Sequence, residues 1–110
     1  MKGDIMVKLT VLYGQPKDPD AFERYYLDTH TPIALKVKGV RRFEIARIVG
    51  AADGSPSPYY RIADLYFDDA NHLQQCMGSQ EGQAAAADIA NFATGGVTML
   101  IAGVQDLSSR

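Results

Sequence analysis

The order of the apolar patterns along this chain is the feature that most constrains its fold. These patterns predict two successive strand–helix–strand units. Four segments have the alternating or dense apolar residues of β-strands, and two longer segments between them have apolar residues at helical steps of three and four. With 110 residues in total, there is room for one domain. The predicted strands span about 6–13, 40–49, 59–67 and 97–104, and the predicted helices about 19–38 and 69–92.

This order predicts an α+β fold, a ferredoxin-like β-α-β-β-α-β sandwich. Right-handed crossovers would place both helices on one face of a four-stranded antiparallel sheet. We expect a single domain over 1–110, with an ordered core over about 6–104.

The second face of this predicted sheet would have no helices over it. Met6 and Leu12 put apolar side chains on that face, and 97–104 is apolar on both sides, which predicts a central or buried strand. A large exposed apolar surface usually marks an interface. We therefore expect a homodimer in which a second copy packs sheet to sheet.

Composition excludes several classes of partner. The net charge of -2 gives no basic surface for nucleic acid, and no apolar stretch is long enough to span a membrane. The 1–8 segment has no signal-peptide pattern, so a cytoplasmic location is the expectation. The single cysteine, Cys76, rules out an intrachain disulfide and is expected to be a buried apolar residue.

His30 is the first candidate functional residue. Asp18 is expected to cap the first helix, and Pro32 to interrupt it, with Thr31 capping a second piece. His30 would lie at the join, where an imidazole can exchange a proton near neutral pH. The alternative is a structural role, in which its ring hydrogen-bonds a backbone carbonyl freed by Pro32.

Asp64 is the second catalytic candidate, because a carboxylate in the middle of a strand needs a partner. It could orient His30 or act as an acid itself. The alternative is a salt bridge to one of three arginines, Arg42, Arg47 or Arg61.

Several tyrosines could bind the oxygen atoms of a substrate while their rings line an apolar pocket. Ordinary core packing is the alternative for each of them. The candidate substrate-binding residues are Tyr13, Tyr25, Tyr26 and Tyr66. The two histidines are not in a ligand cluster and no phosphate-binding loop is present, so we expect neither a metal nor a cofactor.

The sequence over 22–34, FERYYLDTHTPIA, resembles the aromatic-rich first helix of the EthD family, which ends in His-x-Pro. The stretches 79–84 and 88–92 are similar to the family's second-helix pattern, although Gln80 stands where a proline is common. The resemblance covers 7–104. It implies the dimeric α/β-barrel superfamily, whose members include cofactor-independent monooxygenases, polyketide cyclases, muconolactone isomerases and haem-degrading enzymes.

The EthD family is named for ethyl tert-butyl ether degradation and is associated with a bacterial cytochrome P450 system. In this family the histidine equivalent to His30 belongs to the motif. The resulting hypothesis is a protein that binds a small apolar, aromatic or polyketide-like molecule. His30 would be the acid or base in an oxidation, cyclisation, decarboxylation or isomerisation. A non-catalytic carrier that supports a separate oxygenase and a structural dimerisation module are the alternatives.

Overall fold

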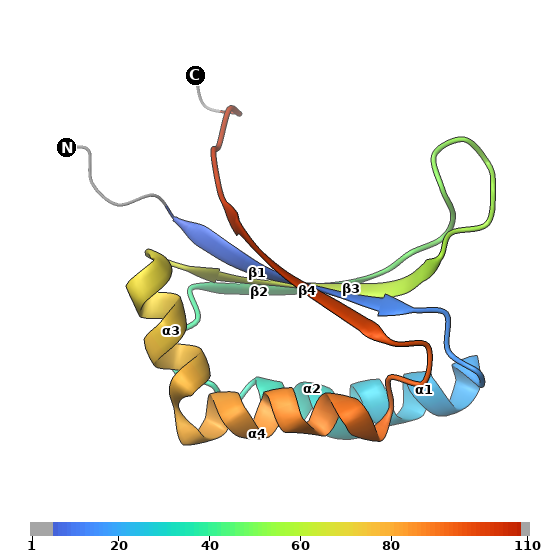
Figure 1. Cartoon of the computed structure of the whole chain (residues 1–110), viewed down its shortest axis with the longest axis horizontal. Helices are drawn as coiled ribbons and strands as arrows, with labels where there is room; N and C mark the ends of the chain where they lie inside the picture. Colours follow the sequence, from blue (N-terminus) through green and yellow to red (C-terminus); the bar gives the residue numbers. More distant parts are fainter. Residues whose placement is uncertain (1–5, 109–110) are drawn as a thin grey trace.

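A computed structural model describes residues 6–108 as a four-stranded sheet with helices packed against one face (Figure 1). The first helix is continuous and contains a wide π-helical turn, η1, in its middle. The elements in chain order are β1 (Val7–Gly14), α1 (Pro19–Tyr25), η1 (Tyr26–His30), α2 (Thr31–Ala34), β2 (Arg42–Arg47), β3 (Tyr59–Phe67), α3 (Ala70–Gly78), α4 (Gln80–Asp88), the 3-10 turn η2 (Ile89–Asn91) and β4 (Val97–Gly103).

The strand order is β2-β3-β1-β4, and all three neighbouring pairs are antiparallel. This confirms the predicted α+β, ferredoxin-like fold. Leu9 in β1 is opposite Leu65 in β3 and Ile101 in β4, so these three residues share the face that the helices cover. The register therefore assigns every strand residue to one of two faces.

Local capping explains where the helices begin. The carboxylate of Asp18 accepts a hydrogen bond from the Ala21 N–H at 3.1 Å, as predicted, and that of Asp69 accepts one from His72 at 2.8 Å. Ser79 lies between α3 and α4, and its hydroxyl caps the start of α4. Each cap satisfies a backbone donor that the helix itself leaves unpaired.

The first helix differs from the prediction at Pro32. It does not break there, because the Thr31 N–H reaches the carbonyl of Tyr26, five residues back, and the Thr31 hydroxyl donates to the same oxygen at 2.8 Å. Thr31 is thus not an N-cap. The wide turn takes up the proline within a continuous helix and brings His30 to the inner side.

The core lies between the sheet and the helices and is rich in aromatic rings. Tyr13, Tyr26 and Phe67 are its largest fully buried side chains. At one end, Arg61 of β3 forms two hydrogen bonds with the Glu23 carboxylate, at 2.7 and 3.0 Å, and its guanidinium lies over the Tyr26 ring. This ion pair ties α1 to the sheet.

The prediction of a central or buried last strand is wrong. β4 lies at the edge of the sheet, and apolar side chains on both of its faces are exposed within one chain: Val97, Met99, Leu100 and Ile101. Apolar content alone does not distinguish a central strand from an edge strand covered by something outside the chain.

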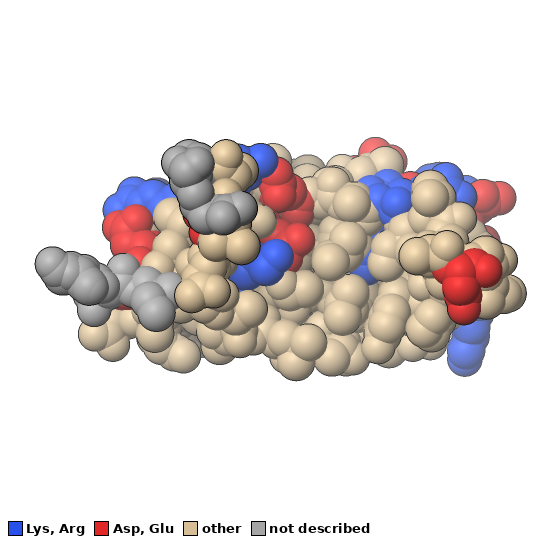
Figure 2. Space-filling model, turned by 90° about the horizontal axis from the view of Figure 1, so that it is seen from above, with Lys and Arg blue, Asp and Glu red and all other residues tan. Residues whose placement is uncertain are grey.

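The open face of the sheet is also more polar than predicted. Lys8, Thr10 and Asp64 form a cluster on it, whereas Leu12 and Leu100 keep another part apolar. Seen from above, acidic and basic groups lie next to a broad uncharged area (Figure 2). None of the helices within 6–108 is long and apolar enough to cross a membrane.

Candidate active site

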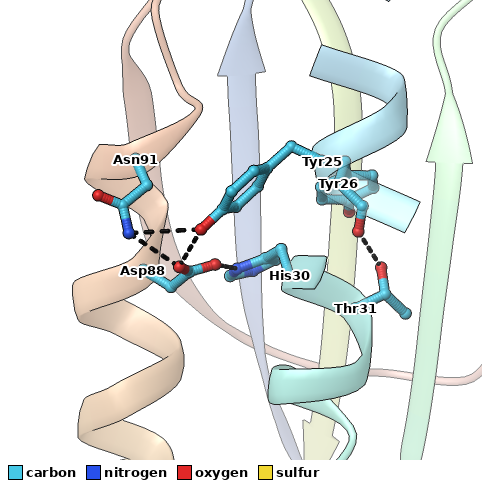
Figure 3. Close-up of polar contacts among 6 residues, drawn as sticks. All are labelled: Tyr25, Tyr26, His30, Thr31, Asp88 and Asn91. Atoms are coloured by element: carbon cyan, nitrogen blue, oxygen red, sulfur yellow. Dashed lines mark hydrogen bonds and ion pairs between the residues drawn. The ribbon is translucent and has the colours of Figure 1, made fainter. Parts of the chain in front are cut away.

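His30 lies on the inner side of the helical layer and is only 6% exposed. Its Nδ1 is 2.9 Å from Oδ2 of Asp88 at the end of α4 (Figure 3). The π-helical turn presents the ring from one helix, and α4 presents the carboxylate from the other. The predicted structural alternative, a hydrogen bond to a freed backbone carbonyl, is therefore wrong, because the partner is a carboxylate.

The second carboxylate oxygen of Asp88 binds two further donors. The Tyr25 hydroxyl donates to Oδ1 at 2.6 Å, and the side-chain amide of Asn91 donates to the same oxygen at 2.9 Å. Figure 3 shows the three side chains converging on Asp88 from two helical segments. Both oxygens are thus held in fixed positions, which fixes the orientation of the imidazole in turn.

The surroundings keep Asp88 ionised. Burial by itself would raise the pKa of Asp88, but hydrogen bonds from Tyr25, Asn91 and His30 outweigh burial and hold that pKa below its usual range. The hydrogen bond to Asp88 raises the pKa of the Tyr25 hydroxyl, which stays a donor. An ionised acceptor at Nδ1 selects the Nδ1–H tautomer and leaves the lone pair on Nε2.

Nε2 of His30 has no hydrogen-bond partner within residues 6–108. The ring packs against Tyr26, with ring centroids 5.8 Å apart, and against Phe92, at 4.7 Å, and these two rings also contact each other. Tyr26 stacks on the imidazole, Phe92 contacts it at a tilt, and Asp88 holds it at one edge. The opposite edge is available to a reacting group.

A small apolar cavity of about 40 Å³ adjoins this imidazole. Its polar groups are few, and it lies between the helical layer and the sheet. The residues that line it are Leu9, Val11, Tyr13, Tyr26, His30, Thr31, Ala34, Phe43, Ala63, Leu65, Met77, Ala85, Ala86, Ile89 and Met99. In this volume there is room for about one water molecule, so an organic ligand needs side chains to move apart.

Burial explains the state of the two tyrosines in the cavity wall. It raises the pKa of Tyr26 to about 12 and raises that of Tyr13 further. Both hydroxyls remain protonated at neutral pH and are able to donate a hydrogen bond.

Four of the predicted site residues are brought together here: Tyr13, Tyr25, Tyr26 and His30. Asp64 is not. It alternates with the buried Ala63 and Leu65 and therefore lies on the open face of the sheet, so the prediction that Asp64 orients His30 is wrong for a single chain.

Asp64 has partners of its own on that face. It accepts a hydrogen bond from Thr10 at 2.6 Å and lies 3.4 Å from Nζ of Lys8, rather than pairing with an arginine. Tyr66 shares this face and lies beside Lys8 and Arg42. The sheet thus separates Tyr66 from His30.

Asp88 and Asn91 were not predicted as site residues. A signal was present, because Asp88 is the one acidic residue in the 84–92 stretch, which is otherwise mostly small or apolar. Asn91 and Phe92 follow it at helical steps of three and four, so all three side chains share one face. Those are the positions that contact Tyr25 and His30.

On the outer side of Asp88, a groove of about 490 Å³ separates α2 from α4. Lys36 and Glu81 line it, together with Asp88 and Asn91. The carboxylate therefore lies between a groove on the surface and the apolar cavity beside His30. Within the described residues, no group of three or more His, Cys, Asp and Glu side chains is arranged to hold a metal ion.

Comparison with known proteins assigns the family. The model of the EthD domain matches residues 14–96, three quarters of the chain. The chain belongs to the EthD family. The His30 motif and Asp88 both lie within the matched range.

Two relatives are similar over most of their length. The "uncharacterized 11.0 kDa protein in thcB-thcC intergenic region" of Rhodococcus erythropolis is 43% identical over 95 residues, which cover 86% of this chain and 91% of the relative. The crystal structure of an EthD family protein from Bacillus halodurans C-125 is 40% identical, with a TM-score of 0.86, over 92% of this chain and 100% of that one.

More distant structures share the fold alone. A dimeric ferredoxin-like protein of unknown function from Thermobifida fusca is 10% identical, with a TM-score of 0.69, over 94% of this chain and 95% of that one. SnoaB from Streptomyces nogalater, a cofactor-independent oxygenase, is 11% identical, with a TM-score of 0.64, over 98% of this chain and 100% of that one.

Proposed function

We propose that this EthD-family chain binds a small, mostly apolar molecule with a single carbonyl or hydroxyl group beside His30. His30 would act on it as a general base or acid. The observation that carries the proposal is an oriented imidazole in the wall of an apolar cavity, with an ionised carboxylate behind it. Groups with perturbed pKa values cluster at functional sites.

Each group has a role in the proposed step. Nε2 takes a proton from the bound molecule, and Asp88 stabilises the imidazolium that forms. Tyr26 or Tyr13 donates a hydrogen bond to the oxygen on which negative charge develops. Proton transfer of this kind needs no bound cofactor, and SnoaB is a cofactor-independent oxygenase on a related fold.

The ligand must enlarge the cavity, and the wall is built in a way that permits this. Met77 and Met99 line it, and methionine changes rotamer readily because it is unbranched. Ala34, Ala63 and Ala85 leave little bulk on the remaining walls. A bicyclic ketone or phenol is of the size and polarity that such a site would accept.

Exchange of α-protons of 2-tetralone in deuterated buffer tests the proposal without knowledge of the natural substrate. A base removes one α-proton and the solvent returns a deuteron, which proton NMR detects. We expect the wild-type protein to bind the ketone and accelerate exchange, and His30→Gln to abolish the acceleration. Asp28→Asn, at an exposed position, is the matched control. Lack of binding would overturn the proposal.

A non-catalytic ligand carrier is the second candidate, and the pairing of His30 with Asp88 is compatible with it because the pair also joins two helices. The same experiment separates the two functions. A carrier would bind 2-tetralone without accelerating exchange, and His30→Gln would keep most of the affinity.

We also propose that the chain works as a homodimer. The Thermobifida fusca protein with this fold is dimeric, and the exposed apolar side chains of β4 need a cover. Sedimentation equilibrium over a range of concentrations tests this assembly, and a monomer at every concentration would contradict it.

A further inference from the structure

The cavity beside His30 has an opening between α4 and β4. Only two of its lining residues are exposed: Ala86 on α4 and Met99 on β4, the latter by 43%. The remaining lining residues are buried or half-buried. A ligand beside His30 would therefore be in contact with water on this side of the isolated chain.

The two edges of the sheet differ in a way that bears on this opening. The β2 edge carries Arg42, Glu44 and Arg47, and charges of this kind protect a free edge from pairing. The β4 edge, VTMLIAG, has no charged residue, and Ile101 is 56% exposed. An unprotected apolar edge in a stable protein is normally covered.

We infer that a second copy of this chain covers the β4 edge and closes the cavity at Met99, so that the ligand site is complete only in the dimer. This inference rests on the proposed function and on the proposed homodimer. A second copy fits because the open face of the sheet, which borders the β4 edge and carries the exposed Leu100, has charges of both signs that are already paired, such as Lys8 with Asp64. Two such faces meet without an excess of like charge.

A consequence is that ligand binding and dimerisation are linked. If the ligand binds the dimer more tightly than the monomer, it strengthens dimerisation by the same factor. The partner would then limit the access of water to the cavity, which strengthens the electrostatic interactions inside it.

Ile101→Glu is the variant that separates the interface from the cavity. Ile101 lies two residues from Met99 on the same face of β4, but it does not line the cavity. Leu35→Glu is the matched control, because Leu35 is equally apolar, 64% exposed and at the end of α2. Sedimentation measures assembly, and 2-tetralone titration followed by NMR measures affinity.

We expect Ile101→Glu to be a folded monomer that binds 2-tetralone at least about tenfold more weakly, with Leu35→Glu unchanged in both respects. A monomeric Ile101→Glu with wild-type affinity, or an Ile101→Glu protein that stays dimeric, would overturn the inference and leave the proposed function standing. Dilution of the wild-type protein gives the same test without a substitution, since affinity should fall as dimers dissociate. A dimeric wild-type protein that binds no ketone would overturn the proposed function instead.

Discussion

Nδ1 of His30 lies 2.9 Å from Oδ2 of Asp88, although 58 residues separate the two in the chain. The π-helical turn and the end of α4 meet only because both helices pack on the same face of the sheet. Since Asp88 also binds Tyr25 and Asn91, one carboxylate joins the two helical segments at several points. The pair is therefore part of the fold as well as the centre of the proposed site.

Asp88→Asn should destabilise the protein even though it preserves the shape of the side chain. The amide replaces one acceptor oxygen by a donor, which must then face either the imidazole N–H or the Tyr25 and Asn91 donors. We expect the free energy of unfolding at pH 7 to fall by about 1–3 kcal/mol. Urea denaturation measures it, and the exposed Asp28→Asn variant is the control. Equal stability of the two variants would contradict the hydrogen-bond network.

The lowered pKa of Asp88 predicts a specific dependence of stability on pH. A carboxyl whose pKa is lower in the folded state stabilises that state at pH values above its unfolded pKa, near about 3.9. This contribution is lost as the pH falls through the lower, folded pKa. From about pH 5 downward, the wild-type protein should therefore lose more unfolding free energy than Asp88→Asn. Parallel curves for the two proteins would show that Asp88 does not contribute.

The fold could be predicted from sequence because its signals are local. Alternation, helical spacing and the caps at Asp18 and Asp69 each act within a few residues, and together they predict the element order. The His30 motif was identified for the same reason. The two faces of β3 also follow from alternation, which places Asp64 and Leu65 on opposite faces, but the prediction that Asp64 could orient His30 did not use this.

The rest depends on tertiary packing. Asp88 could not be paired with His30 from spacing, because the contact needs the relative position of two helices that no local pattern records. The edge position of β4 was missed because its residues have the composition of a buried strand. The wide turn before Pro32 was missed because a proline is compatible both with a break in a helix and with a wide turn inside a continuous helix.

The ion pair between Glu23 and Arg61 should contribute strongly to stability. Arg61 is buried, and Glu23 is its bidentate partner. Glu23→Gln removes the compensating charge from a buried guanidinium, and we expect a loss of about 3 kcal/mol at pH 7. Thermal or urea unfolding measures the loss.

The control for this substitution is Asp68→Asn, which breaks an equally bidentate pair with Arg41 on the surface. Exposed pairs contribute about 0–1 kcal/mol because water and salt screen them. If the two substitutions cost the same, burial of Arg61 would not be the cause of the effect.

Two glycines near the junction of α3 and α4 should respond in opposite directions to the same substitution. A Cβ on Gly82 would lie 2.4 Å from the carbonyl oxygen of Cys76 and 2.6 Å from Cα of Met77, and these backbone atoms cannot move without shifting α3. We expect Gly82→Ala to cost about 1–3 kcal/mol. A Cβ on Gly78 meets no atom within 4 Å. Gly78→Ala should therefore stabilise the protein by about 0.5–1 kcal/mol, because alanine lowers the conformational entropy of the unfolded chain.

Because α4 carries Asp88, Gly82→Ala should also disturb the imidazole signals of His30 in NMR spectra, and Gly78→Ala should leave them unchanged. Stabilisation by both substitutions would show that the close packing of α4 on α3 is wrong.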